Sequence, residues 1–372
     1  MIYASRRSLL GGAVAAALSP KGQAAGGEPY GAGLIGIGNR GSTLLKALLE
    51  EPRAKVTALC DNKPDRLDRA ATSAARDRPA TTSDYRRLLE RTDVQAVVIA
   101  SPCDLHVEMA IAALRAGKHV YCEKPIGITP ASIAELVRVA RGARTVFMAG
   151  QQRHSDMGLR QVVAKIHEGI AGKVRMIKAQ RHASADFAAD GSSADWVFDA
   201  RRSGDVIVEQ AIHNLDICNW VLQSHPERAA GFGGALMSPN QPPGRTITDG
   251  YTVSFDYPGG AKVSFTQVAF HPRDLPFGGE QTYVYGTAGA VAMESGTFYP
   301  KDPQAKPVLL GERKRENREG RHIALFFDCI RSGAKPETDV VLGATAALTA
   351  ILGREAMYQQ KVMAWKDLGV DI

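Results

Sequence analysis

The sequence predicts a parallel α/β domain in its first 150 residues and an α+β domain in the remainder, and three patterns lead to this prediction. Up to about residue 150, short apolar runs alternate with helical stretches, which is typical of βαβ units in a parallel sheet. A glycine-rich turn separates the first apolar run from the first helical stretch. Beyond residue 150 the apolar runs are longer and rich in Val, Thr, Phe and Tyr, which favours a largely antiparallel sheet.

The first 25 residues are predicted to be a targeting segment that belongs to neither domain. Arg6 and Arg7, followed by the apolar run of residues 9–18, are typical of a twin-arginine signal, and Ala24-Ala25 supplies a small-residue cleavage site. The run is too short and too rich in glycine to span a bilayer. Because the twin-arginine route exports folded proteins, we expect a periplasmic protein that binds its cofactor before export.

Composition and charge limit the classes of partner that the chain can have. The chain has 372 residues, enough for two domains, and its apolar share of 44% is ordinary for a globular protein. Removal of residues 1–25 takes away three cations and no acid, which lowers the formal charge from +7 to +4. The densest basic run, residues 313–318, contains Glu316 and no aromatic residue, so we interpret it as a solvated loop and expect no nucleic-acid partner. The five cysteines form no C-x-x-C pair, and we predict free structural thiols.

The glycine-rich turn runs from Gly36 to Gly41 and precedes a helical stretch over residues 42–50, where a dinucleotide-binding fingerprint belongs. Gly36 permits the tight turn, Gly38 lets the backbone approach a pyrophosphate, and Gly41 lets helix and strand pack closely. The start of the helix offers N–H groups and the positive end of its dipole to phosphates. Residues 30–150 are therefore predicted to be a Rossmann dinucleotide-binding domain.

An acidic residue after the second apolar run indicates which dinucleotide binds. Residues 54–59 form this run, and Asp61 follows it. A carboxylate at this place can bind the ribose 2′-hydroxyl of NAD and repels the extra phosphate of NADP. Because Lys63 and Arg66 come next and could accept that phosphate, NAD is the expected cofactor and NADP the alternative.

The remaining elements follow in chain order. In the first domain we expect strands at residues 54–59, 96–100, 119–121 and 145–149, and helices at 67–76, 85–90, 105–116 and 131–141. In residues 151–372, the substrate and oligomerisation domain, we expect helices at 156–168, 205–222, 322–331 and 341–361, and strands at 173–181, 247–257, 261–269 and 281–285. Residues 257–260 are typical of a hairpin turn.

The helix predicted over residues 205–222 carries the most informative side chains. At 100° per residue, Glu209, His213, Asp216 and Trp220 fall within an arc of roughly 60°. An acid, an imidazole and a second acid on one helix face suggest a catalytic site. Two other interpretations stay open, a partly buried histidine with solvated acidic neighbours and a metal site with Glu, His and Asp ligands. The metal site is disfavoured because no further ligand cluster is evident, and we expect no metal.

From about Ala32 onward the chain resembles the Gfo/Idh/MocA oxidoreductase family, which includes glucose–fructose oxidoreductase and inositol dehydrogenases. The residues that carry the resemblance are the turn from Gly36 to Gly41, Asp61, Ser101-Pro102 with His106, Glu123-Lys124-Pro125, and the segment from Glu209 through His213 to Asp216. In the family the first acid of that segment is typically Asp, whereas this chain has Glu209. The resemblance implies an open-faced second sheet that often pairs subunits, and hence a homo-oligomer, either a dimer or a tetramer.

The resemblance also implies a reaction. A sugar or polyol hydroxyl would bind beside the nicotinamide, with His213 as general base and Lys124 as hydrogen-bond donor to the reacting oxygen. Glu209 and Asp216 would hold substrate hydroxyls or orient His213, and Trp196 and Arg153 are further candidates for substrate contacts. The residues expected to bind the cofactor are Gly36, Gly38, Asn39, Arg40, Gly41, Asp61, Ser101, Pro102, His106, Glu123 and Lys124.

Three functions are compatible with these residues. The expected one is an NAD(P)-dependent sugar or polyol dehydrogenase. The second is a redox-assisted glycoside hydrolase or lyase that recycles NAD, although the glycosidase branch carries Tyr-Pro-Thr-His where this chain has Ala211-Ile-His213. The third is a non-catalytic carbohydrate or nucleotide binder, which the joint presence of Lys124 and His213 disfavours. All three have a small carbohydrate or polyol as partner and no stable membrane insertion, and the substrate itself is not specified by the fold.

Overall fold

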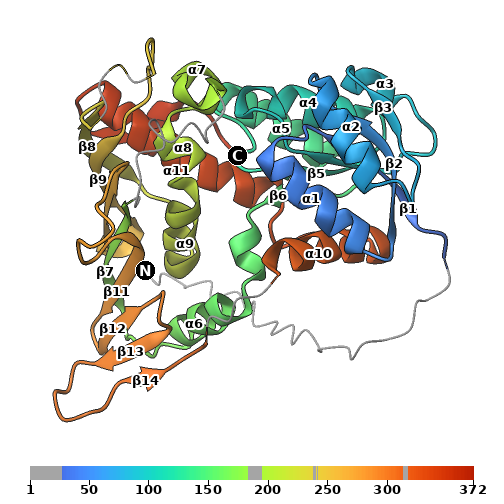
Figure 1. Ribbon diagram of the computed structural model, residues 1–372. Coiled ribbons are helices and arrows are strands. Elements are labelled where there is room, and N and C mark those ends of the chain that lie inside the picture. Colours follow the sequence, from blue (N-terminus) through green and yellow to red (C-terminus); the bar gives the residue numbers. More distant parts are fainter. Residues whose placement is uncertain (1–26, 183–194, 238–239, 241, 313–316) are drawn as a thin grey trace, which may run out of the picture.

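The computed structural model describes residues 27–182, 195–237, 240, 242–312 and 317–372, and the predicted signal segment and most of the basic run lie outside these ranges. The described residues form a parallel-sheet domain and a second domain built on a large, mostly antiparallel sheet (Figure 1). Helices α8 and α9 lie between the second sheet and the first domain. The predicted fold class is therefore confirmed.

The first domain contains a six-stranded sheet in the order β3-β2-β1-β4-β5-β6, in which each pair of neighbours is parallel. Its strands are β1 Tyr30–Ile35, β2 Ala54–Cys60, β3 Ala80–Thr82, β4 Ala96–Ile99, β5 His119–Glu123 and β6 Phe147–Gly150. Its helices are α1 Asn39–Glu50, α2 Pro64–Ser73, α3 Tyr85–Leu89, α4 His106–Arg115 and α5 Pro130–Gly142. Since the strand order reverses between β1 and β4, the ligand crevice is expected at the carboxyl ends of these strands.

The second domain contains a nine-stranded sheet in the order β14-β13-β12-β11-β7-β10-β9-β8-β15, and only β7 and β10 are parallel neighbours. Its strands are β7 Val174–His182, β8 Arg228–Gly234, β9 Gly250–Asp256, β10 Lys262–Val268, β11 Gly279–Gly286, β12 Gly289–Ala292, β13 Thr297–Pro300, β14 Val308–Leu309 and β15 Met363–Ala364. The hairpin turn predicted at residues 257–260 is confirmed between β9 and β10. Sequence patterns missed β3, β8 and β12–β15, because these strands are short or rich in small residues.

Two helices near the end of the chain join the domains. Helix α10, Arg318–Ser332, packs on α1, and α11, Val340–Tyr358, contacts elements of both domains, including α5, α8, α9 and β8. By length and composition α11 is apolar enough to cross a membrane, but most of it is buried inside the protein. Helix α11 is therefore a core helix that contacts strands of both sheets. Helix α6, Met157–His167, packs against α9.

The prediction of a single helix over residues 205–222 is wrong. The structure has a four-residue helix, α8 Val206–Glu209, followed by α9 Ile212–Leu222. In a continuous helix the Glu209 carbonyl would accept a hydrogen bond from the His213 N–H. Here it accepts one from Lys124 Nζ at 2.6 Å, and the Gln210 side chain accepts one from Gln267 Nε2 at 3.1 Å. A contact from the first domain thus replaces the helical hydrogen bond of the Glu209 carbonyl, and the second sheet holds the Gln210 side chain.

Candidate active site

The glycine turn is shaped to admit a dinucleotide. Gly36 has φ +85°, and a Cβ there would lie 2.6 Å from the Ala100 backbone, while a Cβ at Gly41 would lie 1.9 Å from the Gly36 carbonyl oxygen. Above Gly38 the nearest atom is Arg66 Nη1, at 3.7 Å from the Cβ position. Helix α1 begins directly after Gly38 and has no side-chain cap at its N-terminus. The space over Gly38 and the uncapped N–H groups fit a pyrophosphate.

Asp61 lies at the end of β2 and holds the glycine turn in place. One carboxylate oxygen accepts a hydrogen bond from the Ile37 N–H at 2.6 Å, and the other accepts one from the Lys63 N–H at 2.9 Å. Arg66 Nη1 lies 3.9 Å from the same carboxylate. Because each carboxylate oxygen has two lone pairs, Asp61 can still accept a hydrogen bond from a ribose hydroxyl.

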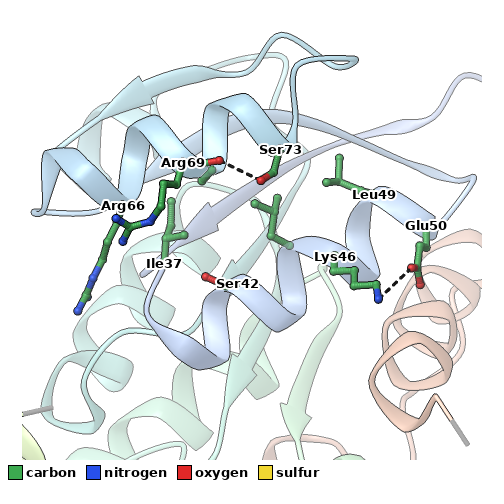
Figure 2. Close-up of a pocket in the computed structure, with 10 residues that line it drawn as sticks. Ile37, Ser42, Lys46, Leu49, Glu50, Arg66, Arg69 and Ser73 are labelled. Atoms are coloured by element: carbon green, nitrogen blue, oxygen red, sulfur yellow. Dashed lines mark hydrogen bonds and ion pairs between the residues drawn. The ribbon is translucent and has the colours of Figure 1, made fainter. Parts of the chain in front are cut away.

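A pocket of about 520 Å³ lies on the outer side of the first domain, between α1 and α2. Figure 2 shows Arg66 and Arg69 of α2 on one side of it and Ser42 and Lys46 of α1 on the other. The pocket is bordered by Ile37 of the glycine turn, but neither Lys124 nor His213 belongs to its lining. It is therefore a recess next to the nucleotide turn and not the place where catalysis is expected.

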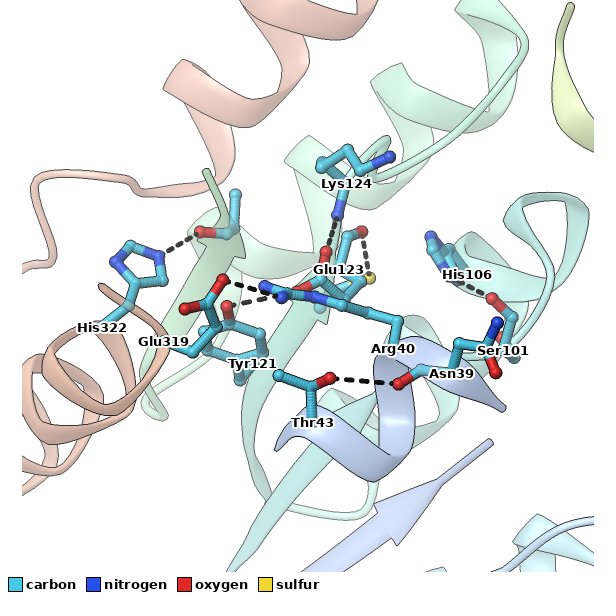
Figure 3. Close-up of polar contacts among 12 residues, drawn as sticks. Asn39, Arg40, Thr43, Ser101, His106, Tyr121, Glu123, Lys124, Glu319 and His322 are labelled. Carbon is cyan, nitrogen blue, oxygen red and sulfur yellow. Dashed lines mark hydrogen bonds and ion pairs between the residues drawn. The ribbon is translucent and has the colours of Figure 1, made fainter. Parts of the chain in front are cut away.

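Arg40 connects the glycine turn to β5 and to α10 (Figure 3). Its Nε donates a hydrogen bond to Glu123 at 2.8 Å, and its Nη1 donates one to Glu319 at 3.2 Å. Burial lowers the pKa of Arg40, but the Glu123 carboxylate outweighs this effect and the pKa is raised. Arg40 and Glu123, both expected to bind the cofactor, therefore contact each other. Tyr121 also donates a hydrogen bond to the Glu123 carboxylate, at 3.4 Å.

His106, the first residue of α4, bridges the two informative loops of the crevice. Its Nδ1 lies 2.7 Å from the Pro125 carbonyl oxygen, and its Nε2 lies 2.9 Å from the Ser101 carbonyl oxygen. Burial lowers the pKa of His106. The imidazole thus fixes the loop with Ser101-Pro102 relative to the loop with Lys124, which is a structural role next to the expected nucleotide site.

Lys124 and Glu209 form an ion pair across the two domains. Lys124 Nζ donates hydrogen bonds to the Glu209 carboxylate at 2.8 Å and to the Glu209 carbonyl at 2.6 Å. The two side chains are 13% and 19% exposed, so a small molecule in the crevice can reach the pair. Burial raises the pKa of Glu209, but the Lys124 charge and hydrogen bond outweigh it, and the pKa is lowered. Lys124 is therefore held at the carboxyl end of β5 by a carboxylate from the second domain.

His213 lies in the first turn of α9, four residues after Glu209. Burial is the largest cause that holds its pKa well below the usual value, and the charges of Arg153, Lys124, Arg181 and Arg40 follow. Its Nδ1 has no hydrogen-bond partner among the described residues. A neutral imidazole with an unpaired ring nitrogen can accept a proton, which is what a general base requires.

Arg153 and Trp196, both predicted to contact substrate, lie in different surroundings. Arg153, in the 3₁₀ helix η2 Gln152–Ser155, forms an ion pair with Glu280 of β11, which also pairs with Arg181 of β7. The charge of Arg153 is one cause of the lowered pKa of His213. Trp196, in η3 Asp195–Phe198, is partly buried against the main core. Sequence patterns missed Arg181 and Glu280, since neither belongs to a recognisable motif.

Asp216 has a different partner from the one expected. It is 3% exposed, and its carboxylate accepts a hydrogen bond from His154 Nε2 at 3.0 Å, so it does not orient His213. The His154 ring also stacks on Trp220 with a centroid distance of 4.2 Å, and its Nδ1 lies 3.6 Å from Glu337. Burial lowers the pKa of His154, but the two carboxylates raise it to about 9. Asp216 and Trp220 thus form a charged, stacked cluster with a histidine 62 positions from Asp216 in the sequence.

Two simpler expectations concern cysteines and metals. All five cysteines are free, four of them buried, as predicted. Within the ranges that the structure describes, no group of three or more His, Cys, Asp or Glu side chains is placed to hold a metal ion.

Comparison with known protein families accounts for both domains. Residues 30–151 match the GFO_IDH_MocA family, described as an oxidoreductase family with an NAD-binding Rossmann fold, and residues 159–292 match the GFO/IDH/MocA C-terminal domain. The chain belongs to the Gfo/Idh/MocA oxidoreductase family. The family resemblance that the motifs indicated is thereby confirmed.

Similar proteins differ in how much of their length they share with this chain. An uncharacterised oxidoreductase, YrbE of Bacillus subtilis, is 26% identical over 264 residues, which are 71% of this chain and 73% of that protein. A myo-inositol 2-dehydrogenase of Thermotoga maritima is 26% identical over 205 residues, 55% of this chain and 58% of that protein. A glycosyl hydrolase family 109 protein of Saccharopolyspora erythraea is 35% identical over 154 residues, 40% of this chain and 34% of that protein. The matches to the last two thus span less than two thirds of those proteins.

Solved structures share the whole architecture. Levoglucosan dehydrogenase in complex with NADH and levoglucosan has a TM-score of 0.79 and 20% sequence identity, covering 91% of this chain and 99% of that one. Myo-inositol 2-dehydrogenase from Lactobacillus plantarum has a TM-score of 0.74 and 21% identity, with the same coverage. At this level of identity the likeness establishes the fold.

Proposed function

We propose that this Gfo/Idh/MocA protein is an NAD-dependent oxidoreductase that moves a hydride between a hydroxyl-bearing carbon of a sugar or polyol and the nicotinamide. The observation that carries the proposal is the convergence of Lys124 from the first domain and His213 from the second. Lys124 Nζ donates hydrogen bonds to the carbonyl and the carboxylate of Glu209, four residues before His213, and the Lys124 charge is one cause of the lowered pKa of His213. Relatives named as inositol and levoglucosan dehydrogenases support the substrate class.

The residues of this chain have separate parts in the reaction. NAD, when bound, supplies a nicotinamide ring that accepts or donates the hydride. His213 takes the hydroxyl proton as a neutral base, and the cations around it favour its later release to solvent. Lys124 donates a hydrogen bond to the same oxygen and stabilises the negative charge that develops there. Glu209 holds Lys124 in position, so the longer side chain in place of the family's usual Asp serves to reach Nζ.

The nucleotide would be held by the glycine turn, the start of α1 and Asp61. The space over Gly38 and the uncapped helix N-terminus fit its phosphates, and Asp61 favours the free ribose hydroxyls of NAD. Arg66 lies next to both Asp61 and Gly38, which supports some use of NADP as well.

Two relatives support a second candidate function. One is the family 109 glycosyl hydrolase, and another is a 2,7-anhydro-N-acetylneuraminate hydratase of Mediterraneibacter gnavus, which is 29% identical over 207 residues. A base, a lysine and a bound NAD would also serve a reaction that oxidises a sugar hydroxyl, eliminates or adds a group, and then reduces the sugar again. Such an enzyme would release product without net formation of NADH.

We also propose export of the folded protein to the periplasm by the twin-arginine route, and association into a homo-oligomer. The arginine pair and apolar run of residues 1–25 support export. Exposed Phe232, Tyr285 and Tyr299 on strands of the second sheet support subunit contacts at that sheet.

One experiment separates the main possibilities. The purified protein is incubated with NAD and a panel of polyols and sugars that includes myo-inositol and levoglucosan, and NADH formation and carbohydrate products are both measured. In parallel, the protein is denatured and any released nucleotide is identified by mass. Formation of NADH that depends on His213 supports the dehydrogenase, product formation without NADH supports the redox-assisted reaction, and neither with any compound would count against both.

A further inference from the structure

We propose that two side chains of α11, Arg354 and Tyr358, act as a positioning brace that holds the Lys124 loop and the Glu209 helix against each other. The inference rests on the proposed role of Lys124. Neither brace residue contacts Lys124, Glu209 or His213 directly, so any effect on them is transmitted through other residues.

The first support is the conformation of Asp205, which precedes α8. Its φ of 77° and ψ of 160° lie in a region that is essentially limited to glycine, and it is 0% exposed. Its carboxylate accepts hydrogen bonds from the Tyr358 hydroxyl at 2.5 Å, the Thr248 hydroxyl at 2.8 Å and the Val206 N–H at 2.5 Å. A residue that keeps a strained backbone in this way is held by its surroundings, and Tyr358 supplies a hydrogen bond from α11.

The second support is the shortness of α8. A helix of four residues is not stable by itself, because too few hydrogen bonds repay its nucleation. The Asp205 carbonyl accepts hydrogen bonds from the N–H groups of Val208 at 3.0 Å and Glu209 at 2.9 Å. Asp205 therefore sets the position of Glu209, whose carbonyl and carboxylate both accept hydrogen bonds from Lys124.

The third support comes from Arg354, one helical turn before Tyr358. Its Nη1 donates hydrogen bonds of 3.1 Å to the carbonyl oxygens of Ile128 and Gly204. Ile128 belongs to the loop that follows Lys124, and Gly204 directly precedes Asp205. Residues four apart share one face of a helix. One face of α11 thus contacts the loop that follows Lys124 in the first domain. The same face contacts Gly204 and Asp205, which precede the Glu209 helix in the second domain.

The test compares Tyr358→Phe and Arg354→Lys with Tyr257→Phe. Tyr257 is a matched control, because its hydroxyl also donates a hydrogen bond within the second domain, but to Asn219 of α9 at 2.7 Å and not to Asp205. Each protein is acetylated with sulfo-N-hydroxysuccinimide acetate, and modification of Lys124 is followed by peptide mass spectrometry relative to Lys262. If the brace is real, Lys124 is modified about three- to ten-fold faster in both brace variants, because the two hydrogen bonds that hold Nζ weaken. In Tyr257→Phe the Lys124 rate is unchanged.

Turnover provides the second measurement. With the best compound of the substrate panel, kcat falls about five- to twenty-fold in the brace variants, since misplaced catalytic groups lose rate, while the Kd for NAD stays within about two-fold. A purely structural role predicts a lower Tm with Lys124 labelling and kcat unchanged, and that result overturns the brace. Faster Lys124 labelling in a protein that turns over no substrate retains the brace and rejects the proposed function. Unchanged labelling with intact turnover rejects the brace and retains the function.

Discussion

Two imidazoles, one in α9 and one packed against it, lie in opposite electrostatic surroundings. His213 lies in the first turn of the helix and faces the cations Arg153, Lys124 and Arg181. His154 comes from η2 and packs against the later turns, between the carboxylates of Asp216 and Glu337. Burial lowers the pKa of both rings, but the neighbouring charges lower it further for His213 and raise it to about 9 for His154. At neutral pH the first ring is neutral and the second is charged.

This difference assigns the two rings to different tasks. When environment separates the pKa values of two titratable groups, it also separates their roles. The neutral His213 can accept a proton from substrate, and the charged His154 links η2 to α9 through Asp216 and stacks on Trp220. Asp216, expected to hold substrate hydroxyls or to orient His213, instead pairs with the charged histidine. The following predictions test this division, from the largest expected effect to the smallest.

Replacement of the neutral histidine should have the largest effect. His213→Ala removes the proposed base, so kcat/KM for NADH formation should fall about 10²- to 10⁴-fold, the usual contribution of general-base catalysis, while the Kd for NAD changes little. His119→Gln is the control, since His119 lies at the amino end of β5, away from the crevice. A His213→Ala protein with near-normal turnover would remove His213 from the reaction.

Replacement of the lysine that faces His213 should come next. Lys124→Met keeps a long unbranched side chain but removes the cation, so kcat should fall about 10²- to 10³-fold as the developing oxyanion loses its donor. Lys118→Met is a matched control, because Lys118 Nζ also donates two hydrogen bonds, to the carbonyls of Arg91 and Val94, but outside the crevice. Equal losses in the two variants would indicate damage to the fold and not to catalysis.

The charged histidine should make stability depend on pH. The folded-state pKa of His154 is raised to about 9, so its contribution is fully present below about pH 6.5, the pKa of an unperturbed imidazole, and is lost as pH rises through 9. From the size of the shift this contribution is on the order of 3 kcal/mol. Denaturant unfolding of the wild type and of Asp216→Asn at pH 6.5 and 9.5 measures it.

Asp216→Asn should be less stable than the wild type at pH 6.5, and the difference should shrink at pH 9.5, above the His154 pKa of about 9. Glu337 retains part of the effect, because its own pKa is held at about 2 in spite of burial, through contacts with His154 and Arg160. The same difference at both pH values would show that His154 is not charged in the folded protein.

Cofactor choice should show the smallest effect. Arg66 lies near both Asp61 and the space over Gly38, so Arg66→Ala should weaken NADP binding by about ten-fold and leave NAD binding nearly unchanged, as expected for loss of one phosphate contact. Arg69→Ala, one turn later on α2, is the control. Calorimetric titration with each dinucleotide distinguishes the two, and equal weakening of NAD would place Arg66 at a phosphate that both cofactors share.

Local patterns predicted the architecture of the first domain except for the short strand β3, and they singled out the catalytic candidates. The glycine turn, the alternating apolar runs and Asp61 each act within a few residues, through backbone conformation, periodicity and strand order, so the sequence alone predicted the nucleotide fold. The same holds for His213 and Lys124, which occur in recognisable segments. Tertiary structure decided how these residues are used.

Only the folded chain shows that the helix breaks after Glu209. The Glu209 carbonyl accepts a hydrogen bond from Lys124, 85 positions away, in place of one from the helix backbone. The folded chain also decides that Asp216 pairs with His154, and that α11 contacts the supports of both Lys124 and Glu209. The physical reason is that a helical period reports which side chains share a face. Which charges and hydrogen-bond donors meet that face depends on segments that packing brings together from distant parts of the chain.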